Sequence, residues 1–451
     1  MNTTIYLFCI GWVAVILIQL FRPELKYRQM LVLFLSASFM LYAFNNIWMP
    51  FIYLAWILLV YYLMLNGHKK YITKIYFLAV VVVFILIKGQ WILIDAKNPL
   101  MEVSIPLGFS FMMFHSFALL QDSANKVLNK KVIFLEYAAS ALYFPTFSAG
   151  PFHKIQVFQE KEKHTITGVR SFEGYCLFCL GTFKFALSGI LLSKDLLGVV
   201  PIYYVKGHSL HPINILMLSS IYLYTNFSGY SDIVVGFSKM MGFEIPINFK
   251  FPFFSISLAE YWRKWHITLG AWFKEYVFFP LNYYLIKKLS KKISSDFLTK
   301  VSIFITFLLI GIWHQFSLKI LTYSIFNALL VAFFFPKNKK WWGYLTTFFL
   351  ALIINLLFVS AGLKVFVEIM TSFFSALPDT LIYKNVMVLV MAIILFVIIF
   401  YLEKLIDKIS SANEGNAEYF VFGMNFIVSI VTLFLGITWG TGHLNAVYVG
   451  Y

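Results

Sequence analysis

Two histidines that each follow a tryptophan are the residues in this sequence most suited to chemistry. His266 lies in the basic, aromatic stretch "EYWRKWHITLGAWFKEYVFFPL", and His314 lies in the almost wholly apolar "LLIGIWHQF". An ionisable side chain in such an apolar run is costly, and this indicates a function. A desolvated imidazole stays neutral near pH 7 and can take a proton from a hydroxyl. We therefore predict that His314 is a general base; the alternative is a neutral histidine bonded to a backbone carbonyl.

The stretch around His266 has the pattern of a helix at the membrane surface. In a helix its large apolar side chains would form one mainly aromatic stripe, made of Tyr261, Trp265, Leu269, Trp272 and Phe273. Three cations would lie away from that stripe: Arg263, Lys264 and Lys274. Rings at headgroup level with cations reaching toward water or phosphate are typical of an interfacial helix. Two interpretations stay open, a surface helix without a catalytic role and a site whose cations guide a phosphate-bearing donor.

The composition predicts an all-α polytopic membrane protein. The chain is 61% hydrophobic and 20% aromatic, with a mean hydropathy of +0.80. Apolar windows near the length of a membrane span recur along it, and we predict about 10 to 13 transmembrane helices. The clearest windows are Ile5–Phe21, Met30–Phe44, Trp48–Leu65, Ile75–Ile94, Leu177–Leu192, Val301–Trp313, Ile320–Phe335, Trp342–Val359, Val386–Phe400 and Phe420–Leu435. The first has no small-residue cleavage site, which favours a retained helix.

The charge pattern indicates a membrane rather than a nucleic acid as the partner. The net charge is +16 at pH 7, but the basic residues gather in short loops beside the apolar windows. This is the positive-inside pattern, which anionic lipid headgroups reinforce. Its alternation predicts that Lys69–Lys74 are cytoplasmic, whereas the N-terminus and the tail "HLNAVYVGY" lie outside.

We expect one membrane-embedded domain, 1–451, in three parts. Plain hydrophobic hairpins make up 1–103, and 327–451 holds further hairpins and the outer tail. In the middle part, 104–326, glycine, proline, histidine and charge interrupt apolar runs such as "YTNFSGYSDIVVGFSKMMGFEIPINF". Irregular backbone at membrane depth survives only where protein buries it or water lines it. The middle part is therefore predicted to hold re-entrant segments or a cavity.

Other polar groups carry weaker signals. "SGYSD", Ser228–Asp232, lacks the Gly-x-Ser-x-Gly elbow of a serine nucleophile. Small-residue helix packing, with Asp232 bonded to a partner, is the favoured interpretation. Cys176 and Cys179 are predicted to fill apolar space, since no second ligand pair follows them. The sequence has no phosphate-binding loop, zinc pattern or dinucleotide fingerprint, and we predict no metal site.

Four blocks, taken in order, resemble the membrane-bound O-acyltransferase superfamily. They are "PTFSAGPFHK", "NFSGYSD" with the following "MGFEIPINF", the stretch around His266, and "GIWHQ". They resemble most the bacterial branch with the alginate O-acetyltransferase subunit and the teichoic acid D-alanyltransferase. The resemblance implies a ring of transmembrane helices around a thinned centre. A tunnel there would let an acyl donor from the cytoplasm meet an acceptor from the other side.

The resemblance also implies roles for single residues. His314 matches the family's catalytic base, and His266 matches a second histidine required in this branch. Three positions depart from the family pattern: Gln315 replaces a glycine, Lys264 an arginine and Thr268 a serine. Lys264 keeps the charge but not the planar fork of arginine. The predicted substrate and donor contacts are Arg263, Lys264, Trp265, Trp313, Gln315, Asp232 and Tyr451.

The expected activity is O-acyl transfer in the bacterial cytoplasmic membrane. An acetyl or D-alanyl group would pass from a cytoplasmic thioester, acyl-CoA or an acyl-phosphopantetheine carrier protein, to a hydroxyl of an envelope polymer. No bound cofactor is expected, and an extracytoplasmic acyltransferase is a further expected partner. Tyr451 would seat the acceptor or carry the acyl group; an aromatic of the interfacial belt is the alternative. A transporter or flippase of a lipid-linked precursor and an inactive scaffold are the competing hypotheses.

Overall fold

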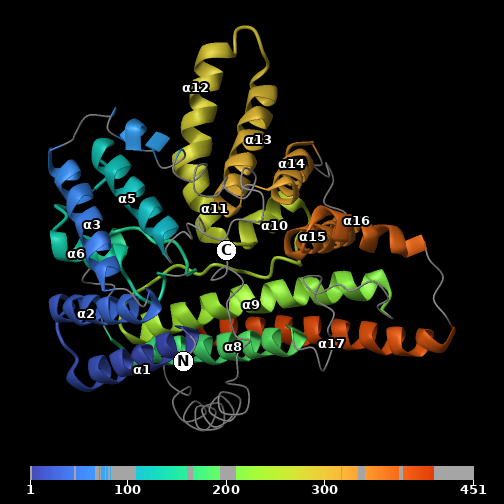
Figure 1. Ribbon diagram of the computed structural model, residues 1–451, viewed down its shortest axis with the longest axis horizontal. Coiled ribbons are helices and arrows are strands. Elements are labelled where there is room, and N and C mark those ends of the chain that lie inside the picture. Colours follow the sequence, from blue (N-terminus) through green and yellow to red (C-terminus); the bar gives the residue numbers. More distant parts are fainter. Residues whose placement is uncertain are drawn as a thin grey trace.

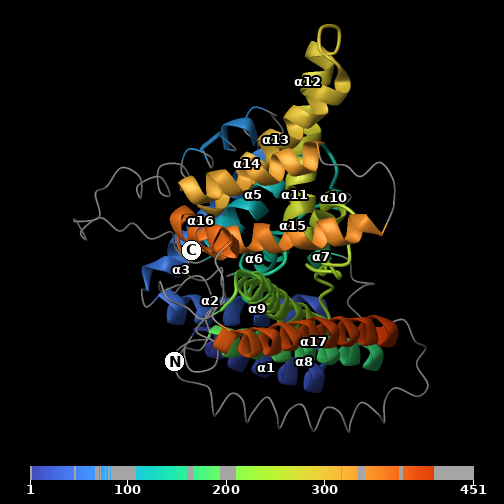
Figure 2. The same cartoon turned by 90° about the vertical axis from the view of Figure 1, so that its right-hand side faces the viewer.

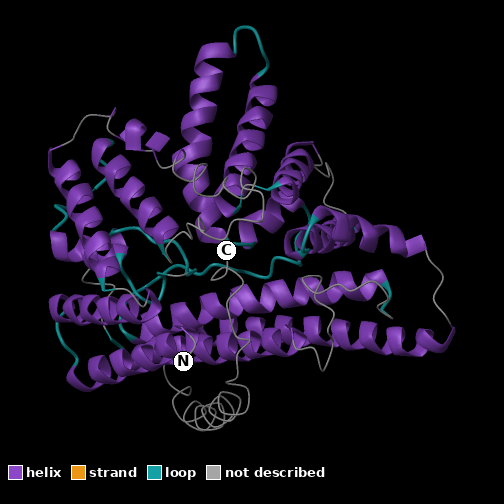
Figure 3. Ribbon diagram, in the orientation of Figure 1, coloured by secondary structure: helices purple, strands orange, loops and turns teal. Residues whose placement is uncertain are grey.

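The described part of the chain consists of helices and the loops between them. A computed structural model describes residues 3–44, 47–66, 108–128, 130–147, 149–159, 166–192, 210–315, 317–333, 341–374 and 379–410, with a few positions between 71 and 82. Helices joined by loops account for these residues, and no strand occurs among them (Figure 3). The predicted outer tail with Tyr451 lies outside this range.

The helices follow one another in three groups. The first group is α1 (Thr3–Phe21), α2 (Leu25–Phe44), α3 (Trp48–Asn66), α5 (Phe109–Ala124), α6 (Phe134–Ala141) and α7 (Gln156–Gln159). The second is α8 (Gly168–Leu192), α9 (Pro212–Met240), α10 (Leu258–Lys264), α11 (Ile267–Phe273), a π-helical turn η4 (Lys274–Phe278), α12 (Phe279–Leu289) and α13 (Ser295–His314). The third is α14 (Leu318–Phe333), α15 (Trp342–Val359), α16 (Leu363–Thr371), a 3-10 turn η5 (Ser372–Phe374) and α17 (Asp379–Ser410).

Five of these helices contain segments long and apolar enough to cross a membrane. The segments are Leu25–Phe44, Trp48–Leu65, Ser295–His314, Trp342–Val359 and Asn385–Lys408, and two shorter apolar helices are Tyr6–Phe21 and Leu318–Phe333. The predicted class, an all-α polytopic membrane protein, is confirmed. The number of spans stays a prediction, because windows such as Phe420–Leu435 lie outside the described residues.

The long helices α8, α9 and α17 form one layer with α1, and the hairpin α12–α13 projects away from it (Figures 1 and 2). Helix α9 belongs to two hydrophobic cores. Its first half, Ile215–Phe227, packs into a core shared with α14, α15 and α17. Its second half, Tyr230–Met240, packs with α1, α2, α5 and α6. Because α9 runs through both cores, a residue that packs on α9 has a defined position relative to each core.

Helix α9 is continuous, although its glycines predicted an interrupted segment. A Cβ added to Gly229 would lie 2.7 Å from the backbone nitrogen of Phe185 and 2.8 Å from the carbonyl oxygen of Gly181 on α8. The glycine therefore permits close helix contact, as small residues do in membranes, and does not break the helix. The irregular backbone begins only afterwards, at Gly242 with φ 79°, and continues to Ser257.

The stretch around His266 is not one helix, so the predicted single aromatic stripe is wrong. Helix α10 ends at Lys264, and α11 begins at Ile267. His266 stands between them with φ 47°, in the left-handed region. The backbone of the preceding segment holds this reversal: Lys250 N–H donates to Lys264 O at 3.0 Å, and Ile267 N–H donates to Asn248 O at 2.9 Å.

The break sends the aromatic residues to two different clusters. Tyr261 and Trp265 stack on each other, with ring centroids 5.6 Å apart, in the core shared with α15. Trp272 packs on Phe114 of α5 at 4.3 Å, in the other core. His266 therefore sits at the junction between the two cores.

Candidate active site

His266 is buried and held by an amide. Its ring is only 4% exposed, and Nδ1 lies 3.1 Å from Asn248 Oδ1. The imidazole and the Phe227 ring of α9 make an edge-to-face contact, with centroids 4.7 Å apart. The Phe152 ring lies roughly parallel to the imidazole, with centroids 6.3 Å apart. These contacts come from α9, from the segment after Gly242 and from the 149–154 loop. They belong to two of the four blocks quoted from the sequence, "NFSGYSD" with "MGFEIPINF", and "PTFSAGPFHK".

Thr268 connects the loop to the same amide. Its hydroxyl donates to Asn248 Oδ1 at 2.9 Å and accepts from Phe152 N–H at 2.9 Å. A threonine keeps the hydroxyl expected at this position, so the replacement of serine leaves the hydrogen bonds possible. The loop that carries Phe152 and His153 is thereby fixed to the helix that follows His266.

His314 is the last residue of α13, and Trp313 before it is buried. The rings of Trp313 and His314 are 4.4 Å apart, and His314 meets Phe358 of α15 at 5.5 Å. Trp313 also meets Phe152 in an edge-to-face contact at 6.3 Å. Phe152 is thus the ring that both Trp-His pairs share, since it contacts His266 of one pair and Trp313 of the other.

Gln315 caps the helix that ends at His314. Its backbone is extended, with φ −166°, and its N–H donates to Gly311 O at 3.0 Å. The side chain is partly exposed. An extended backbone is open to any residue, so this position does not need the glycine of the family pattern.

Trp265 does not join His266, although the two residues are neighbours in sequence. Its ring meets Phe249 at 5.1 Å and Tyr224 at 6.0 Å, in the core with α15. The left-handed backbone at His266 turns the two side chains apart: Trp265 lies inside the core with α15, whereas His266 contacts a ring of each core, Phe227 and Phe152. Trp265 packs against Tyr224 and Phe249, and its donor contact stays a prediction.

The three predicted cations differ in how they are engaged. Lys264 pairs with Glu260 at 2.7 Å and donates to Phe254 O at 2.8 Å. Arg263 and Lys274 are exposed, and the Lys274 ammonium lies 5.4 Å from the centre of the Phe279 ring. The charges of Arg263 and Lys274 are therefore exposed to solvent, whereas that of Lys264 is held by Glu260 and Phe254 O.

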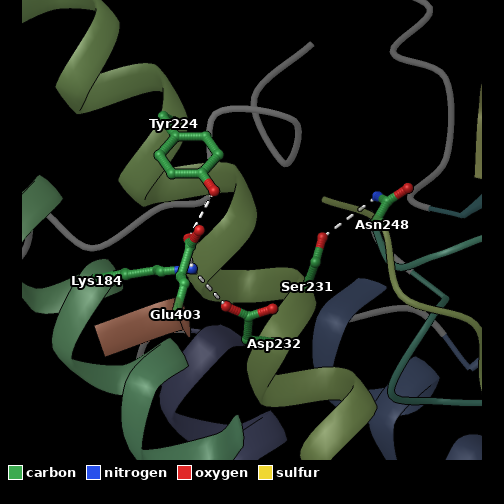
Figure 4. A network of polar contacts seen from close by, with 6 residues as sticks. All are labelled: Lys184, Tyr224, Ser231, Asp232, Asn248 and Glu403. Carbon is green, nitrogen blue, oxygen red and sulfur yellow. Dashed lines mark hydrogen bonds and ion pairs between the residues drawn. The ribbon is translucent and has the colours of Figure 1, made fainter. Parts of the chain in front are cut away.

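Asp232 lies in a buried ion cluster between α8, α9 and α17 (Figure 4). Lys184 Nζ is 2.8 Å from Asp232 Oδ2 and also pairs with Glu403. Tyr224 O–H donates to Glu403 Oε1 at 2.6 Å. The favoured interpretation from the sequence, helix packing with Asp232 bonded to a partner, agrees with this arrangement. A donor contact for Asp232 remains a prediction.

Sequence reasoning missed Asn248, Phe152 and Lys184. Asn248 and Phe152 lie inside quoted blocks, "EIPINF" and "AGPFHK". A polar amide after a Pro-containing irregular segment was the available signal for Asn248, and it is 1% exposed. Lys184 stands alone in an apolar helix, which is the same kind of signal that identified His314.

His266 is a neutral imidazole at neutral pH. Burial lowers the pKa of His266, which lies outside the candidate membrane spans, from 6.5 to about 3. At neutral pH its ring is uncharged and has one basic nitrogen. No group of three or more potential metal ligands occurs within the part of the chain that the structure describes.

Comparison with known proteins gives the class. The model of the MBOAT family, described as "membrane-bound O-acyltransferase family", matches residues 34–335. A match over more than half of the chain shows that the protein belongs to this family of membrane acyltransferases. The matched range contains Asn248, His266 and His314.

Three relatives show the range of chemistry among similar proteins. The teichoic acid D-alanyltransferase of Bacillus subtilis is 29% identical over 58% of this chain and 68% of its own length. The Pseudomonas putida protein named "Probable alginate O-acetylase AlgI" is 30% identical over 51% of this chain and 45% of its own. The peptidoglycan O-acetyltransferase of Helicobacter pylori is 26% identical over 48% and 44%. The chain thus spans less than half of the length of these two acetyl-transferring relatives.

Proposed function

We propose that the protein transfers a small acyl group from a cytoplasmic thioester to a hydroxyl of a cell-envelope polymer. The single observation that carries this is the meeting of His266 and the Trp313–His314 pair at Phe152. His266 and Trp313, the neighbour of His314, both contact Phe152, and all four residues lie inside the range that matches the family. The bacterial cytoplasmic membrane is the proposed location.

In the proposed reaction His314 is the general base. Its imidazole takes the proton of the acceptor hydroxyl while that oxygen attacks the thioester carbonyl carbon. The C–O bond forms, the C–S bond breaks, and the thiolate leaves and takes up the proton from the imidazolium. His266 assists as a second neutral imidazole. The donor thioester is a substrate, either acyl-CoA or an acylated phosphopantetheine carrier protein.

D-alanyl is the acyl group that the comparisons favour. Identity to the two kinds of relative is equal, near 29–30%, but the alignment covers 68% of the D-alanyltransferase and 45% of the alginate relative. The proposed acceptor is accordingly a teichoic-acid-like polymer, and the proposed donor is a D-alanylated carrier protein. Transfer of an acetyl group instead would contradict the proposed acyl group, donor and acceptor.

The test is transfer by the purified protein in lipid nanodiscs. Radiolabelled D-alanyl carrier protein and radiolabelled acetyl-CoA are offered separately, and label in the polymer is counted. His314→Ala should lower the rate about 10²–10⁴-fold, the usual share of general-base catalysis. His211→Ala, a change at the N-cap of α9, is the matched histidine control.

A His314→Ala protein that kept more than half of the wild-type rate while folded would overturn the assignment of the base. Movement of an unmodified lipid-linked precursor across the bilayer, unchanged by His314→Ala, would support a transporter instead. Label from acetyl-CoA but not from the carrier would assign the acetyl group. Absence of transfer from both donors would support an inactive scaffold.

A further inference from the structure

We propose that Asn248 is a positioning residue that holds His266 in the tautomer protonated at Nδ1, so that Nε2 is the basic nitrogen. The tautomer follows from hydrogen-bond geometry alone. Its catalytic consequence rests on the acyl-transfer function proposed above.

The direction of the Asn248 amide is determined by a backbone donor. Thr268 N–H points at the same amide atom as His266, with a nitrogen-to-oxygen distance of 3.3 Å. A backbone N–H can only donate, so the amide atom facing it must be the carbonyl oxygen Oδ1. His266 Nδ1 faces that oxygen at 3.1 Å, and an oxygen without a proton can only accept. The hydrogen must therefore be on Nδ1.

The other end of the amide agrees with this orientation. Asn248 Nδ2 donates to Ser231 Oγ on α9 at 3.3 Å (Figure 4). The Thr268 hydroxyl oxygen accepts a hydrogen bond from Phe152 N–H, and the hydroxyl proton is donated to Asn248 Oδ1 at 2.9 Å. A flipped amide would place its NH2 group against Thr268 N–H, donor against donor. The Ser231 hydroxyl accepts in this orientation, and the backbone N–H of Thr268 is the group that decides it.

The backbone fixes where Asn248 and His266 meet. Asn248 O accepts from Ile267 N–H at 2.9 Å, directly after His266. Asn248 therefore holds the reversal at His266 by its main chain and the imidazole by its side chain. Asn248, Ser231, Thr268 and His266 are all buried, with at most 6% exposure, so water does not compete for these bonds.

The tautomer decides what His266 can do in the reaction. A ring with hydrogen on Nε2 would donate from that atom and could stabilise an oxyanion. A neutral ring with the hydrogen on Nδ1 presents a lone pair at Nε2 and accepts a proton or a hydrogen bond there. The geometry therefore assigns His266 the role of a proton acceptor at Nε2, supported by Asn248.

Two substitutions separate positioning from packing. Asn248→Leu removes the acceptor, so neither tautomer of His266 is favoured by a partner at Nδ1. Asn248→Asp keeps an acceptor for Nδ1 and for both Thr268 donors, and the Ser231 hydroxyl can turn to donate to the carboxylate. Asn355→Asp is the matched control: Asn355 is 2% exposed and its Oδ1 accepts from Tyr261 O–H at 3.1 Å, away from His266.

The first measurement is nitrogen-15 NMR of histidine-labelled protein in lipid, with His266→Gln to identify the His266 signals. In the wild type, Nδ1 of His266 should carry the proton and Nε2 should have the shift of an unprotonated nitrogen. Asn248→Asp and Asn355→Asp should keep this pattern. Asn248→Leu should give a mixture of tautomers. A wild-type His266 protonated at Nε2 would overturn the inference, whatever reaction the protein catalyses.

The second measurement is the split between kcat and KM for donor. Orienting partners of functional histidines typically contribute 10- to 100-fold to activity, so Asn248→Leu should lower kcat by about that factor. KM should change less than about threefold, because Asn248 acts through His266 and not on the donor. Asn248→Asp should recover most of the loss. A wild-type kcat in Asn248→Leu would overturn the positioning role; a wild-type protein inactive with both donors would overturn the proposed function but not the tautomer.

Discussion

His153 shows at the residue scale how burial makes stability depend on pH. It lies in the 149–154 loop, outside the candidate membrane spans, and is 6% exposed. Burial lowers its pKa from 6.5 to about 4. Between pH 6.5 and 4 the imidazole of His153 is protonated in the unfolded chain but not in the folded chain. The free energy of unfolding therefore falls as the pH falls.

We predict that His153→Gln flattens this acid loss. Glutamine does not titrate, and its amide can still donate to Ser140 O, which His153 Nε2 meets at 3.3 Å. Between pH 6.5 and 4 the free energy of unfolding of the wild type should fall by about 1.4 kcal/mol per pH unit more than that of the variant. Denaturant unfolding at several pH values measures this. Above pH 6.5 the curves should run parallel, and parallel curves below it would contradict the prediction.

The exposed cations beside His266 give a second prediction at this scale. The double substitution Arg263→Glu/Lys274→Glu should raise KM for the anionic donor severalfold at low salt. The effect should shrink as added salt screens the charges beyond about 10 Å. Lys287→Glu/Lys288→Glu, at the far end of α12, controls for net charge alone. An equal rise in both double variants would indicate general anchoring rather than a local donor site.

At the scale of elements, the ion cluster fastens α17 to the α8–α9 pair. Lys184 is 2% exposed and is shared by Asp232 of α9 and Glu403 of α17. Removing one partner of a buried ion pair costs about 3–5 kcal/mol, because the remaining charge is left uncompensated. Lys184→Met should therefore destabilise the protein by about that amount, as measured by thermal unfolding in detergent or lipid.

Two companion variants make this test specific. Lys300→Met removes a pair with Asp296, whose side chain is 77% exposed, and should cost no more than about 1 kcal/mol. Adding Glu403→Gln to Lys184→Met should recover part of the loss, since one uncompensated carboxylate disappears. A Lys184→Met protein as stable as Lys300→Met would show that the cluster does not hold α17.

At the scale of the whole molecule, the proposed reaction joins two sides of a membrane. The charge pattern predicts that the tail "HLNAVYVGY" lies outside, opposite the cytoplasmic donor. Deletion of 445–451 should lower delivery to the polymer severalfold and leave donor binding unchanged, if Tyr448 or Tyr451 seats the acceptor. Polymer labelling and donor binding, measured on the same nanodiscs, separate the two effects. If the truncated protein labelled the polymer as fully as the wild type, the tail would have no role in transfer, and its tyrosines would be aromatics of the interfacial belt.

The class of fold could be predicted from the amino-acid sequence, and the sequence also singled out the two histidines as candidates. Hydrophobic windows predict membrane helices because their length and composition are local properties, and α13 ends at His314 close to where its apolar window ended. The wrong prediction, one helix through His266, was also local in origin. Its apolar spacing was correct, but a left-handed residue interrupted it.

Which groups meet depends on how helices and loops pack in three dimensions. The reversal at His266 is held by backbone bonds to Asn248 and Lys250, which helical periodicity cannot register. Phe152 joins the two Trp-His pairs from a loop more than a hundred residues before either. The tautomer of His266 depends on a backbone N–H, an amide and a hydroxyl brought together from separate segments. Hydrogen bonds depend on distance and direction in space, so the chain order alone leaves them open.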